Sequence, residues 1–330
     1  MELKGKNVLV TGGAGFVGSH LVDKLVQEGN KVIVFDNLST GNLRFLEESI
    51  DKIELVQRDL FSDKDDLDKA MKGVDFVFHL AANADIKLNL KEPLKCLDQN
   101  TIVTSNVLEA MRKNGVKDIA FSSTGSVYGE PKVHPTPEDA PFPVQTSMYG
   151  ASKLAGEGLL QAYSEGYGFN VYIFRFVSLM GERYSHGCVF DFYKKLMQDY
   201  TQLEILGNGK QRKSYLYVKD CINAMFTVIE NSKERLNIYN LGHDEFIEVT
   251  PIANLVCDEL GLQDVKFVYS GGERGWVGDS PFIHLDISKI KKLGWKRTLS
   301  IEECVRKTAN WIKENDWVVE RECQNITRCH

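Results

Sequence analysis

Short apolar runs alternate with amphipathic segments along the first half of the chain. Runs rich in β-branched and aromatic residues occur at 6–11, 31–36, 53–56, 76–80, 119–121 and 171–176. Segments with apolar residues at helical spacing separate most of them, notably at 19–28, 100–113 and 149–167. Continuous apolar strands are typical of a parallel sheet that is buried on both faces. The alternation therefore predicts an α/β fold built on an open, doubly wound parallel sheet.

The pattern changes after about residue 177. The elements become shorter and less regular, and glycine, aromatic and basic residues become more frequent. A helical pattern and a strand-like run inside the segment 215–242 can still return to the main sheet. We therefore predict one domain over residues 1–177, with returning segments near 215–242, and a smaller, interleaved C-terminal α/β lobe over 178–330.

Composition and charge narrow the possible partners. The chain has 330 residues, of which 43% are hydrophobic and 26% charged, and its formal net charge is -6. The basic residues are scattered, so no broad positive surface for nucleic acid or an anionic membrane is expected. No apolar run approaches membrane-spanning length, and the N-terminus lacks the pattern of a signal peptide. These features predict a cytoplasmic protein without a nucleic-acid or membrane partner.

The cysteines point to the same compartment. There are seven, an odd number, and none stands in a C-x-x-C spacing, which is typical of reduced thiols in the cytosol. Cys323, Cys329 and His330 are imaginable metal ligands, but a polar, frayed tail is the simpler interpretation. We expect no metal site. The sequon at Asn325 carries no weight without a secretory route.

A glycine-rich turn follows the first predicted strand. Residues 11–18, TGGAGFVG, form a G-x-x-G-x-x-G pattern that opens an amphipathic helix. Glycines let the backbone approach a pyrophosphate, and the helix start supplies free N–H groups. Asp36 ends the second strand near the spacing expected for a residue that binds a ribose diol. Because this carboxylate would repel a 2'-phosphate, the combination predicts a Rossmann-type site that prefers NAD, although Arg44 lies further along the same loop.

A second set of residues predicts chemistry near that cofactor. Tyr149 and Lys153 are four residues apart on a predicted helix and therefore share a face. A phenol with an ordinary pKa near 10 is a poor base, so a nearby ammonium is expected to stabilise its phenolate. Thr124 ends an apolar strand within the hydroxyl-rich run SSTGSVYG, at the sheet edge where α/β proteins bind ligands. Its hydroxyl can bond the substrate oxygen that loses or gains a proton.

These motifs together resemble those of the extended short-chain dehydrogenase/reductases, specifically nucleotide-sugar epimerases of the UDP-glucose 4-epimerase type. The resemblance covers nearly the whole chain to about residue 310. The segments that carry it are TGGAGFVGSH (11–20), FDNLSTG (35–41), RDL (58–60), FHLAA (78–82), SSTGSVYGE (122–130), MYGASKLAGE (148–157), GNGKQRKSYLYVKD (207–220) and RGWVGDSPFIHLDISKIKKLGW (274–295).

The resemblance implies roles for individual residues. It implies Thr124, Tyr149 and Lys153 as the catalytic residues. It implies an NAD site lined by Gly12, Gly15, Phe16, Val17, Asp36, Asn37, Asp59, Leu60, Ala81, Ala82, Asn100, Ser122, Tyr149 and Lys153. The smaller lobe would bind a nucleotide-diphosphate sugar, and the candidate substrate residues are Asp85, Thr124, Ser126, Tyr149, Ser178, Arg212, Lys213 and Arg274. Arginine and lysine suit the dianionic diphosphate.

The same resemblance implies a homodimer. Relatives of this type pair the helices near 100–113 and 149–165 of two subunits into a four-helix bundle. A homodimer held by these two helices is therefore expected here.

The sequence departs from the family pattern at several positions. Relatives that dehydrate or decarboxylate sugars usually carry an acidic residue after the catalytic hydroxyl, whereas Gly125 and Ser126 follow Thr124 here. This argues against dehydration and decarboxylation. Ser178 and Lys213 replace a frequent Asn and a usual Arg, which leaves the pose of the substrate open. Asn83-Ala84-Asp85 is also uncommon, and Asp85 either meets a sugar hydroxyl or caps a helix.

Four other conspicuous residues have structural interpretations. His79 stands inside an apolar run and is expected to be a packed strand residue, not a base. Arg175 also interrupts an apolar strand and is expected to make buried structural hydrogen bonds. Tyr128 and Trp276 are assigned to the core or to a lid.

Three functions follow from the residues, in order of preference. The first is NAD-dependent epimerisation of a nucleotide sugar at C4 through a transient 4-keto intermediate. The second is a C4 dehydrogenase or 4-ketoreductase that acts on a nucleotide-linked hexose or heptose with the same residues. The third is a non-catalytic NAD-binding sensor or scaffold, because a fold alone does not prove chemistry. The identity of the nucleotide and of the sugar stays open.

Overall fold

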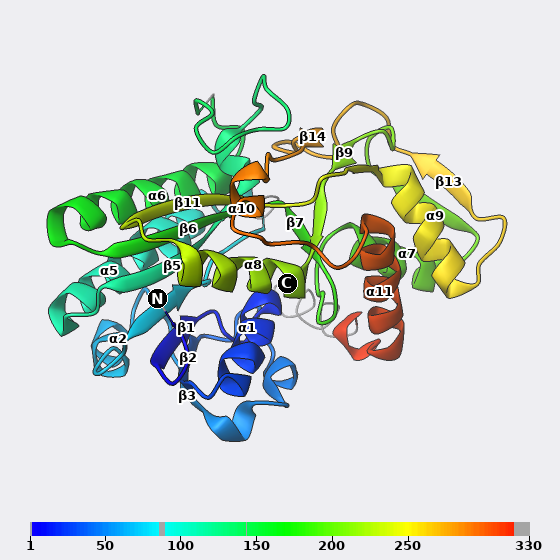
Figure 1. Ribbon diagram of the computed structural model, residues 1–330. Coiled ribbons are helices and arrows are strands. Elements are labelled where there is room, and N and C mark those ends of the chain that lie inside the picture. The colour runs from blue at the N-terminus through cyan, green and yellow to red at the C-terminus, as the bar shows by residue number, and fades with distance from the viewer. Residues whose placement is uncertain (1, 86–89, 143, 320–330) are drawn as a thin grey trace. The chain divides into compact units, whose positions relative to one another are not determined.

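The apolar runs of the sequence form a seven-stranded sheet in the computed structural model, which describes residues 2–85, 90–142 and 144–319 (Figure 1). Its strands are β1 (Asn7–Thr11), β2 (Lys31–Asp36), β3 (Ile53–Gln57), β4 (Phe76–His79), β5 (Asp118–Thr124), β6 (Asn170–Phe176) and β11 (Leu236–Leu241). They lie in the order β11-β6-β5-β4-β1-β2-β3, and every pairing is parallel. The chain winds outward first through β2 and β3 and then through β5 and β6, so the predicted doubly wound α/β fold is confirmed.

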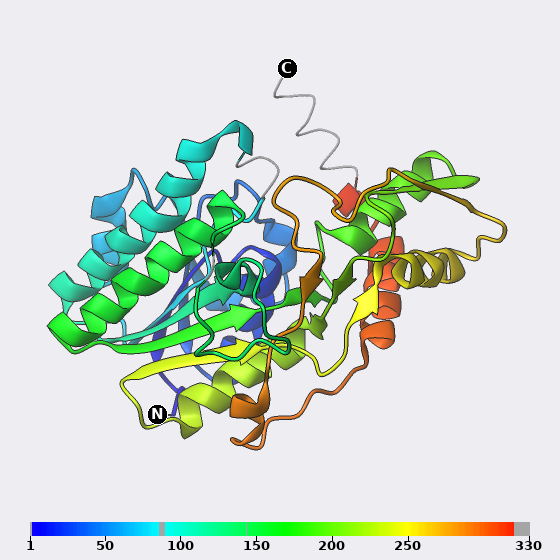
Figure 2. The ribbon, with the colours of Figure 1, turned by 90° about the horizontal axis from the view of Figure 1, so that it is seen from above.

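Helices cover both faces of this sheet, as Figure 2 shows from above. They are α1 (Phe16–Gln27), α2 (Lys64–Ala70), α5 (Val103–Asn114), α6 (Met148–Tyr167) and α8 (Val218–Asn231). On one face, Val107 of α5 and Leu160 of α6 belong to a buried apolar cluster with side chains of the strands. On the other face, Phe226 of α8 stacks on Phe78 of β4 with ring centroids 6.4 Å apart. Both faces are buried, which explains why the strands read as continuous apolar runs.

The elements that carry the predicted catalytic residues have well-defined ends. β5 continues through the hydroxyl run to Thr124, and a 3-10 turn over Gly125–Tyr128 follows it. α6 begins after Ser147, whose side chain accepts a hydrogen bond from the backbone of Gly150, and it ends at Gly168 in the left-handed region. A capped start of this kind fixes the first turn of the helix. The first turns of α6 are the part that holds Tyr149 and Lys153.

The chain divides into two compact units. The first consists of Met1–Phe176, Ile222–Leu241 and Asp286–Trp295 and contains the seven-stranded sheet. The second consists of Val177–Cys221, Gly242–Leu285 and Lys296–His330. Residues 222–241 return to the sheet as the end of α8 and β11. Residues 286–295 also belong to the first unit, which the sequence prediction placed in the smaller lobe; their helix α10 (Ser288–Lys291) packs on β11, where Lys289 bonds a strand carbonyl.

Short strands and three longer helices build the second unit. Its small sheets pair β10 with β7, β9 with β12 and β14, and β13 with β8. The elements are β7 (Ser178–Met180), α7 (Cys188–Gln198), β8 (Gln202–Ile205), β9 (Arg212–Lys213), β10 (Tyr215–Tyr217), β12 (Ile247–Glu248), α9 (Val249–Leu260), β13 (Lys266–Tyr269), β14 (Phe282–Ile283) and α11 (Ile301–Glu314). Among the described residues of the chain, no helix is both long and apolar enough to cross a membrane.

Candidate active site

The turn between β1 and α1 leaves space for backbone alone. Gly12 has a φ of +70°, and a Cβ on it would lie 2.7 Å from the backbone nitrogen of Ala81. A Cβ on Gly18 would lie 2.1 Å from the carbonyl oxygen of Gly12. Gly15 caps α1 and donates its N–H to the Gly12 carbonyl at 3.2 Å. The glycines therefore make a close approach between this loop, the helix start and the end of β4, which is the cradle that a pyrophosphate needs.

The end of β2 supports the same turn. Asp36 is buried, and its carboxylate accepts hydrogen bonds from the backbone N–H of Ala14 at 2.9 Å and of Leu38 at 2.8 Å. Burial raises the pKa of Asp36, while these two hydrogen bonds act in the opposite direction. A carboxylate has about four lone-pair sites, so acceptor capacity remains for a ribose diol. Phe16 and Val17 form the first turn of α1, and the N–H groups and positive dipole end of a helix start favour an anion.

Three predicted cofactor residues lie just after two neighbouring strands: Asn37 follows β2, and Asp59 and Leu60 follow β3. Asn37 donates to the Asp59 carboxylate at 2.6 Å, and the backbone N–H of Phe61 donates to it at 2.7 Å. Burial alone would raise the pKa of Asp59, but these hydrogen bonds, together with one from Gln99, outweigh it and lower the pKa. Leu60 is buried beside them. Asp59 is thus an ionised anchor for this loop.

The end of β4 is held by a buried histidine. His79 lies 2.7 Å from the Thr11 hydroxyl through Nδ1, and burial lowers its pKa to about 3. It is therefore a neutral, packed strand residue, as predicted. The backbone N–H of Ala81 donates to Thr11 Oγ1 at 3.3 Å, and the Ser122 hydroxyl donates to the His79 carbonyl at 3.4 Å. Ala81 and Ala82 follow β4 and are half-buried.

Asn100 lies in a buried polar cluster of its own. Its carbonyl oxygen accepts from the backbone N–H of Asn83 at 2.7 Å, and its amide donates to Ser152 Oγ at 2.9 Å and to the Asn83 carbonyl at 3.1 Å. Cys96 Sγ lies 3.3 Å from Ser152 Oγ. The side chain of Asn100 therefore ties the segment after β4 to α6. Asp85 is exposed, and its backbone N–H bonds the side chain of Asn83; residues 86–89, where a cap would act, lie outside the described residues.

The predicted catalytic hydroxyls meet at the carboxyl end of β5. Thr124 Oγ1 accepts from the backbone N–H of Ser126 at 3.1 Å and lies 3.2 Å from Ser126 Oγ. The Thr124 hydroxyl also bonds the phenol of Tyr149. The structure therefore brings Thr124, Ser126 and Tyr149 together at the sheet edge where α/β proteins bind ligands.

The expected effect of the lysine on the phenol is not found. Burial raises the pKa of Tyr149 to about 12, while the hydrogen bond with Thr124 acts to lower it. Burial also lowers the pKa of Lys153 to about 7, against the opposing effects of Cys96 and Glu157. The lysine ammonium lies 4.4 Å from the centre of the Phe121 ring. Burial is the largest influence on the pKa of both groups, and the structure therefore shows no acidified phenol.

Arg175 makes the buried structural bonds that were expected of it. Its guanidinium forms a two-pronged ion pair with Glu157, at 2.7 and 3.0 Å, and its third nitrogen donates to the Tyr128 hydroxyl at 2.6 Å. Tyr128 is buried and belongs to the core of the first unit. These residues lie beside β5 and α6 and are not placed to react themselves.

The three basic residues predicted to bind the substrate belong to the second unit, and each makes different contacts there. Lys213 forms an ion pair with the buried Asp279 at 2.6 Å, and its ammonium lies 4.9 Å from the centre of the Trp276 ring. Arg274 donates to the Asp279 carbonyl at 3.0 Å. Asp279 thus joins Lys213 to the segment that carries Arg274. Trp276, assigned to the core or a lid, lies within this cluster.

Arg212 is held by aromatic rings. Its guanidinium lies 4.5 Å from the centre of the Phe282 ring and 5.3 Å from that of Phe246. Ser178 begins β7 and pairs with Tyr215 of β10. The neighbouring positions 212 and 213 therefore differ in their contacts: Lys213 pairs with a carboxylate, whereas Arg212 packs against aromatic rings.

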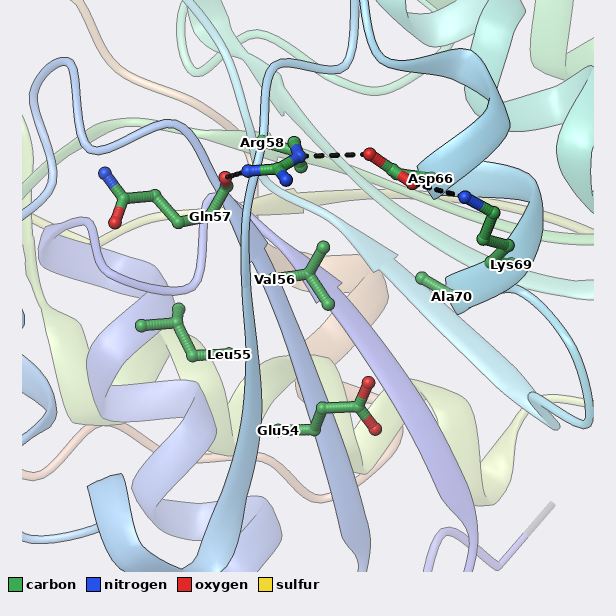
Figure 3. A pocket seen from close by; sticks show the side chains of 8 residues that line it. All are labelled: Glu54, Leu55, Val56, Gln57, Arg58, Asp66, Lys69 and Ala70. Carbon is green, nitrogen blue, oxygen red and sulfur yellow. Dashed lines mark hydrogen bonds and ion pairs between the residues drawn. The ribbon is translucent and has the colours of Figure 1, made fainter.

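A cavity of about 380 Å³ lies elsewhere, at the outer edge of the sheet (Figure 3). Its lining residues come from β3, the residue after it, and α2: Glu54, Leu55, Val56, Gln57, Arg58, Asp66, Lys69 and Ala70. Arg58 and Lys69 both pair with Asp66 across its rim, at 3.0 and 2.7 Å. None of the predicted site residues lines it. Its exposed ion pairs indicate a solvated groove at an edge strand.

Metal and thiol chemistry have little support in the described residues. No group of three histidine, cysteine or acidic side chains there is placed to hold a metal ion. The five cysteines within residues 2–85, 90–142 and 144–319 are all free thiols. Cys323, Asn325, Cys329 and His330 lie outside that part of the chain.

Four residues that the sequence prediction left out determine much of this geometry: Cys96, Ser152, Glu157 and Asp279. Glu157 had a detectable signal, because it follows Lys153 by one helical turn on the side that also holds the apolar Leu160. A carboxylate on the buried side of a helix implies a buried cation as its partner. The partner itself depends on tertiary structure and was not readable.

Comparison with known proteins agrees with this geometry. The model of the NAD dependent epimerase/dehydratase family matches residues 8–242. A solved UDP-galactose 4-epimerase is 38% identical, with a TM-score of 0.84, over 94% of this chain and 99% of that one. A UDP-glucose 4-epimerase from Thermotoga maritima, solved with UDP-glucose, is 32% identical, with a TM-score of 0.85 and the same coverage. UDP-glucuronic acid decarboxylase 1 of Xenopus tropicalis is 31% identical over 94% of this chain and 72% of its own.

The chain belongs to the NAD dependent epimerase/dehydratase family. It is an enzyme of that family, within the extended short-chain dehydrogenase/reductase group that its sequence resembles, and its cofactor is NAD. The glycine cradle at Gly12 and the carboxylate of Asp36 fit this cofactor, since the first admits a pyrophosphate and the second a ribose diol.

Proposed function

We propose that the protein is an NAD-dependent 4-epimerase of a UDP-linked sugar. The observation that carries the proposal is the convergence of Thr124, Tyr149 and Lys153 at the carboxyl end of β5 and the first turns of α6. Relatives that are 4-epimerases of UDP-sugars support the substrate class. A sugar hydroxyl that meets both the threonine hydroxyl and the phenol is positioned for proton transfer.

The chain's own residues would handle the proton at the C4 oxygen. Thr124 orients the C4 hydroxyl, and Tyr149 takes its proton as the carbon becomes a ketone. Bound NAD would supply the hydride acceptor and donor for C4, and its positively charged ring would lower the pKa of the phenol. After the keto sugar rotates so that its opposite face meets the cofactor, Tyr149 returns the proton to the oxygen on the inverted carbon. Lys153 in its charged form would hold the phenolate and a ribose.

We assign the cofactor and substrate sites to the residues that the resemblance implies. Gly12, Gly15 and Asp36 would hold the pyrophosphate and a ribose of NAD, with the other predicted residues at the ends of β3 and β4. Arg212 and Arg274 would bind the diphosphate as charge-assisted donors. Lys213 would contribute only if it leaves its carboxylate partner. The second unit would then be the substrate lobe. Asp85, Ser126 and Ser178 remain candidates for the sugar.

The loop after Thr124 favours epimerisation over decarboxylation. The 3-10 turn that follows the threonine, Gly125–Tyr128, contains no acidic residue. Dehydration and decarboxylation need a further acid or base near the sugar, which family members usually carry directly after the hydroxyl. The decarboxylase relative therefore has less support as a guide to the reaction. A released-cofactor dehydrogenase or ketoreductase is the alternative that the same residues would also serve.

A panel of nucleotide sugars tests the reaction. Purified protein incubated with UDP-glucose, UDP-galactose, UDP-N-acetylglucosamine and UDP-glucuronate should convert at least one of them to its C4 epimer, seen by proton NMR, without net accumulation of reduced cofactor. Net reduction of added NAD in proportion to sugar oxidised would favour the dehydrogenase. Loss of carbon dioxide from UDP-glucuronate would favour the decarboxylase, and no turnover would favour a non-catalytic NAD-binding role.

We further propose a homodimer formed by the α5 and α6 regions. Leu94 on α4 (Pro93–Cys96) is 72% exposed, and Ala155, Gly158 and Ala162 form an exposed row of small residues on α6. Small residues let helices approach closely, and an exposed leucine favours burial. Light scattering should give twice the chain mass, and Leu94→Glu should halve it, while Tyr200→Glu, which changes another exposed side chain in the second unit, should not. A monomeric wild type would contradict the proposal.

The free thiols of the described residues support a cytoplasmic location.

A further inference from the structure

A buried carboxylate joins the two elements that carry the catalytic candidates. Glu157 of α6 is fully buried, and its side chain accepts a hydrogen bond from the Ser123 hydroxyl of β5 at 2.5 Å. The same carboxylate receives two hydrogen bonds from Arg175 of β6, at 2.7 and 3.0 Å. One carboxylate therefore spans a helix and two adjacent strands at the edge of the sheet where the reaction is proposed.

The arginine continues this connection to the rest of the first unit. Arg175 donates to the Tyr128 hydroxyl at 2.6 Å and to the carbonyl of Glu138 at 2.8 Å. Tyr128 in turn donates to Asn240 of β11 at 2.9 Å. The carboxylate of Glu157 is thus part of a satisfied polar network that joins α6 to β5, to β6, to the turn of Tyr128 and to β11. Satisfied buried networks rigidify the groups that they connect.

The place of Glu157 in the sequence decides what this network can align. It lies one helical turn after Lys153, and its bond partner Ser123 directly precedes Thr124. Movement of α6 along β5 would stretch the Ser123–Glu157 bond and, at the same time, separate Thr124 from the phenol on the same helix. The Ser123–Glu157 hydrogen bond and the alignment of Thr124 with the phenol are therefore coupled, because Ser123 and Thr124 are neighbours in the backbone.

We propose that Glu157 is a positioning residue that fixes the alignment of Tyr149 and Lys153 on α6 with Thr124 on β5. The proposal rests on the proposed epimerase function for its effect on turnover, but not for its effect on the lysine. Glu157 is not a catalytic residue, because its two oxygens are occupied by Arg175 and Ser123. A buried ion pair adds little net stability compared with apolar residues of similar size, so alignment is a reason to keep one.

Glu157 also contributes charge to the lysine. Lys153 interacts electrostatically with Cys96 on α4, Glu157 on α6 and His79 on β4, and its ammonium lies over the ring of Phe121 of β5. Burial lowers the pKa of Lys153 to about 7, and the Glu157 charge raises it toward its ordinary value. Removing that charge should leave less of the ammonium form at neutral pH.

The test compares two carboxylate-to-amide changes at buried sites. Glu157→Gln should lower kcat about 10- to 100-fold on the sugar that the panel identifies, with KM and NAD affinity changed less than about threefold. Asp220→Asn is the matched control: Asp220 is buried in the second unit and accepts from the backbone and the hydroxyl of Thr298, both at 2.8 Å. If the two variants lose the same amount of melting temperature, Asp220→Asn should still keep kcat within about twofold of the wild-type value. Equal kcat losses in both variants would reduce Glu157 to a structural residue.

The pH dependence supplies a second criterion. If charged Lys153 is the working form, kcat falls as pH rises through its pKa, and Glu157→Gln should move that fall to lower pH. An unchanged profile would overturn the electrostatic part of the proposal. Arg175→Met keeps the hydrogen bond between Ser123 and Glu157. It should lower the melting temperature but change kcat less than Glu157→Gln does.

A third measurement separates this proposal from the proposed function. In protein labelled with ¹³C at the lysine ε-carbon, the Lys153 signal is identified by its loss in Lys153→Arg. Its titration midpoint should lie near neutral pH in the wild type and lower in Glu157→Gln, whether or not any sugar is turned over. A midpoint that Glu157→Gln leaves in place would contradict the role of Glu157 even in an active enzyme. A shifted midpoint in a protein without turnover would count only against the epimerase.

Discussion

Tyr149→Phe should abolish sugar epimerisation and leave NAD binding intact. The phenol is the acid and base for the C4 oxygen in our mechanism, and general acid–base catalysis contributes about 10²- to 10⁴-fold. We therefore expect kcat to fall at least about 10³-fold, because our mechanism assigns the proton transfer at the C4 oxygen to this phenol alone. Product formation followed by NMR measures turnover, and fluorescence titration measures the affinity for NAD, which should stay within about threefold.

The control for this variant lies on the same helix. Tyr163 is also a tyrosine of α6, and its hydroxyl donates to Glu109 of α5 instead of facing the strand ends. Tyr163→Phe removes the same atom and should keep kcat within about twofold. Retention of more than about a tenth of wild-type turnover by Tyr149→Phe, or an equal loss of turnover in Tyr163→Phe, would show that the assignment of the phenol is wrong.

Gly12→Ala should have the largest effect on cofactor binding. A Cβ at this position would lie 2.7 Å from the backbone nitrogen and 2.8 Å from the Cα of Ala81, and neither is the flexible end of a side chain. The turn must move, which displaces the loop from the pyrophosphate. We expect NAD affinity to fall by about 100-fold, or about 2.7 kcal/mol. Overpacking of this kind also costs about 1–3 kcal/mol of unfolding free energy, which denaturant titration measures.

Gly5 provides a matched comparison for the glycine. It has the same φ of +70°, but a Cβ on it would meet no atom within 4 Å. Gly5→Ala and Gly12→Ala therefore share the cost of the left-handed conformation, about 1–2 kcal/mol, and differ only in the steric contact. Gly5→Ala should leave NAD affinity unchanged. Similar affinities for NAD in the two variants would show that the contact at Ala81 has no influence on the cofactor site.

Much of the first unit could be predicted because its signals are local. Buried parallel strands read as apolar runs, and glycine turns and hydroxyl caps mark their ends, so the sheet, α6 and the course of β5 to Thr124 were foreseeable. Residues 286–295 were misplaced because a four-residue helix carries no periodicity that tells which unit it packs on. The bond from Lys289 to a β11 carbonyl depends on chain topology alone.

The chemistry of the site was predicted less fully than its members. The spacing of Tyr149 and Lys153 predicted a shared helix face, but not the burial that moves the pKa of the tyrosine up and that of the lysine down. Desolvation depends on all surrounding elements and has no sequence signal. Lys213 was predicted to face the diphosphate, and its ion pair with Asp279, which is distant in sequence, was not foreseen. Pairings between distant residues are where reading a single sequence fails.

The central claim is that hydride leaves and returns to the same carbon within one turnover, and an isotope experiment tests it most directly. The nucleotide sugar that the panel identifies is prepared with deuterium at C4 and incubated with catalytic amounts of the protein in ordinary water. Our account predicts a C4-epimerised product that retains the deuterium at C4, detected by NMR and mass spectrometry. Product with hydrogen from the solvent at C4, or deuterium released into free reduced cofactor, would contradict it.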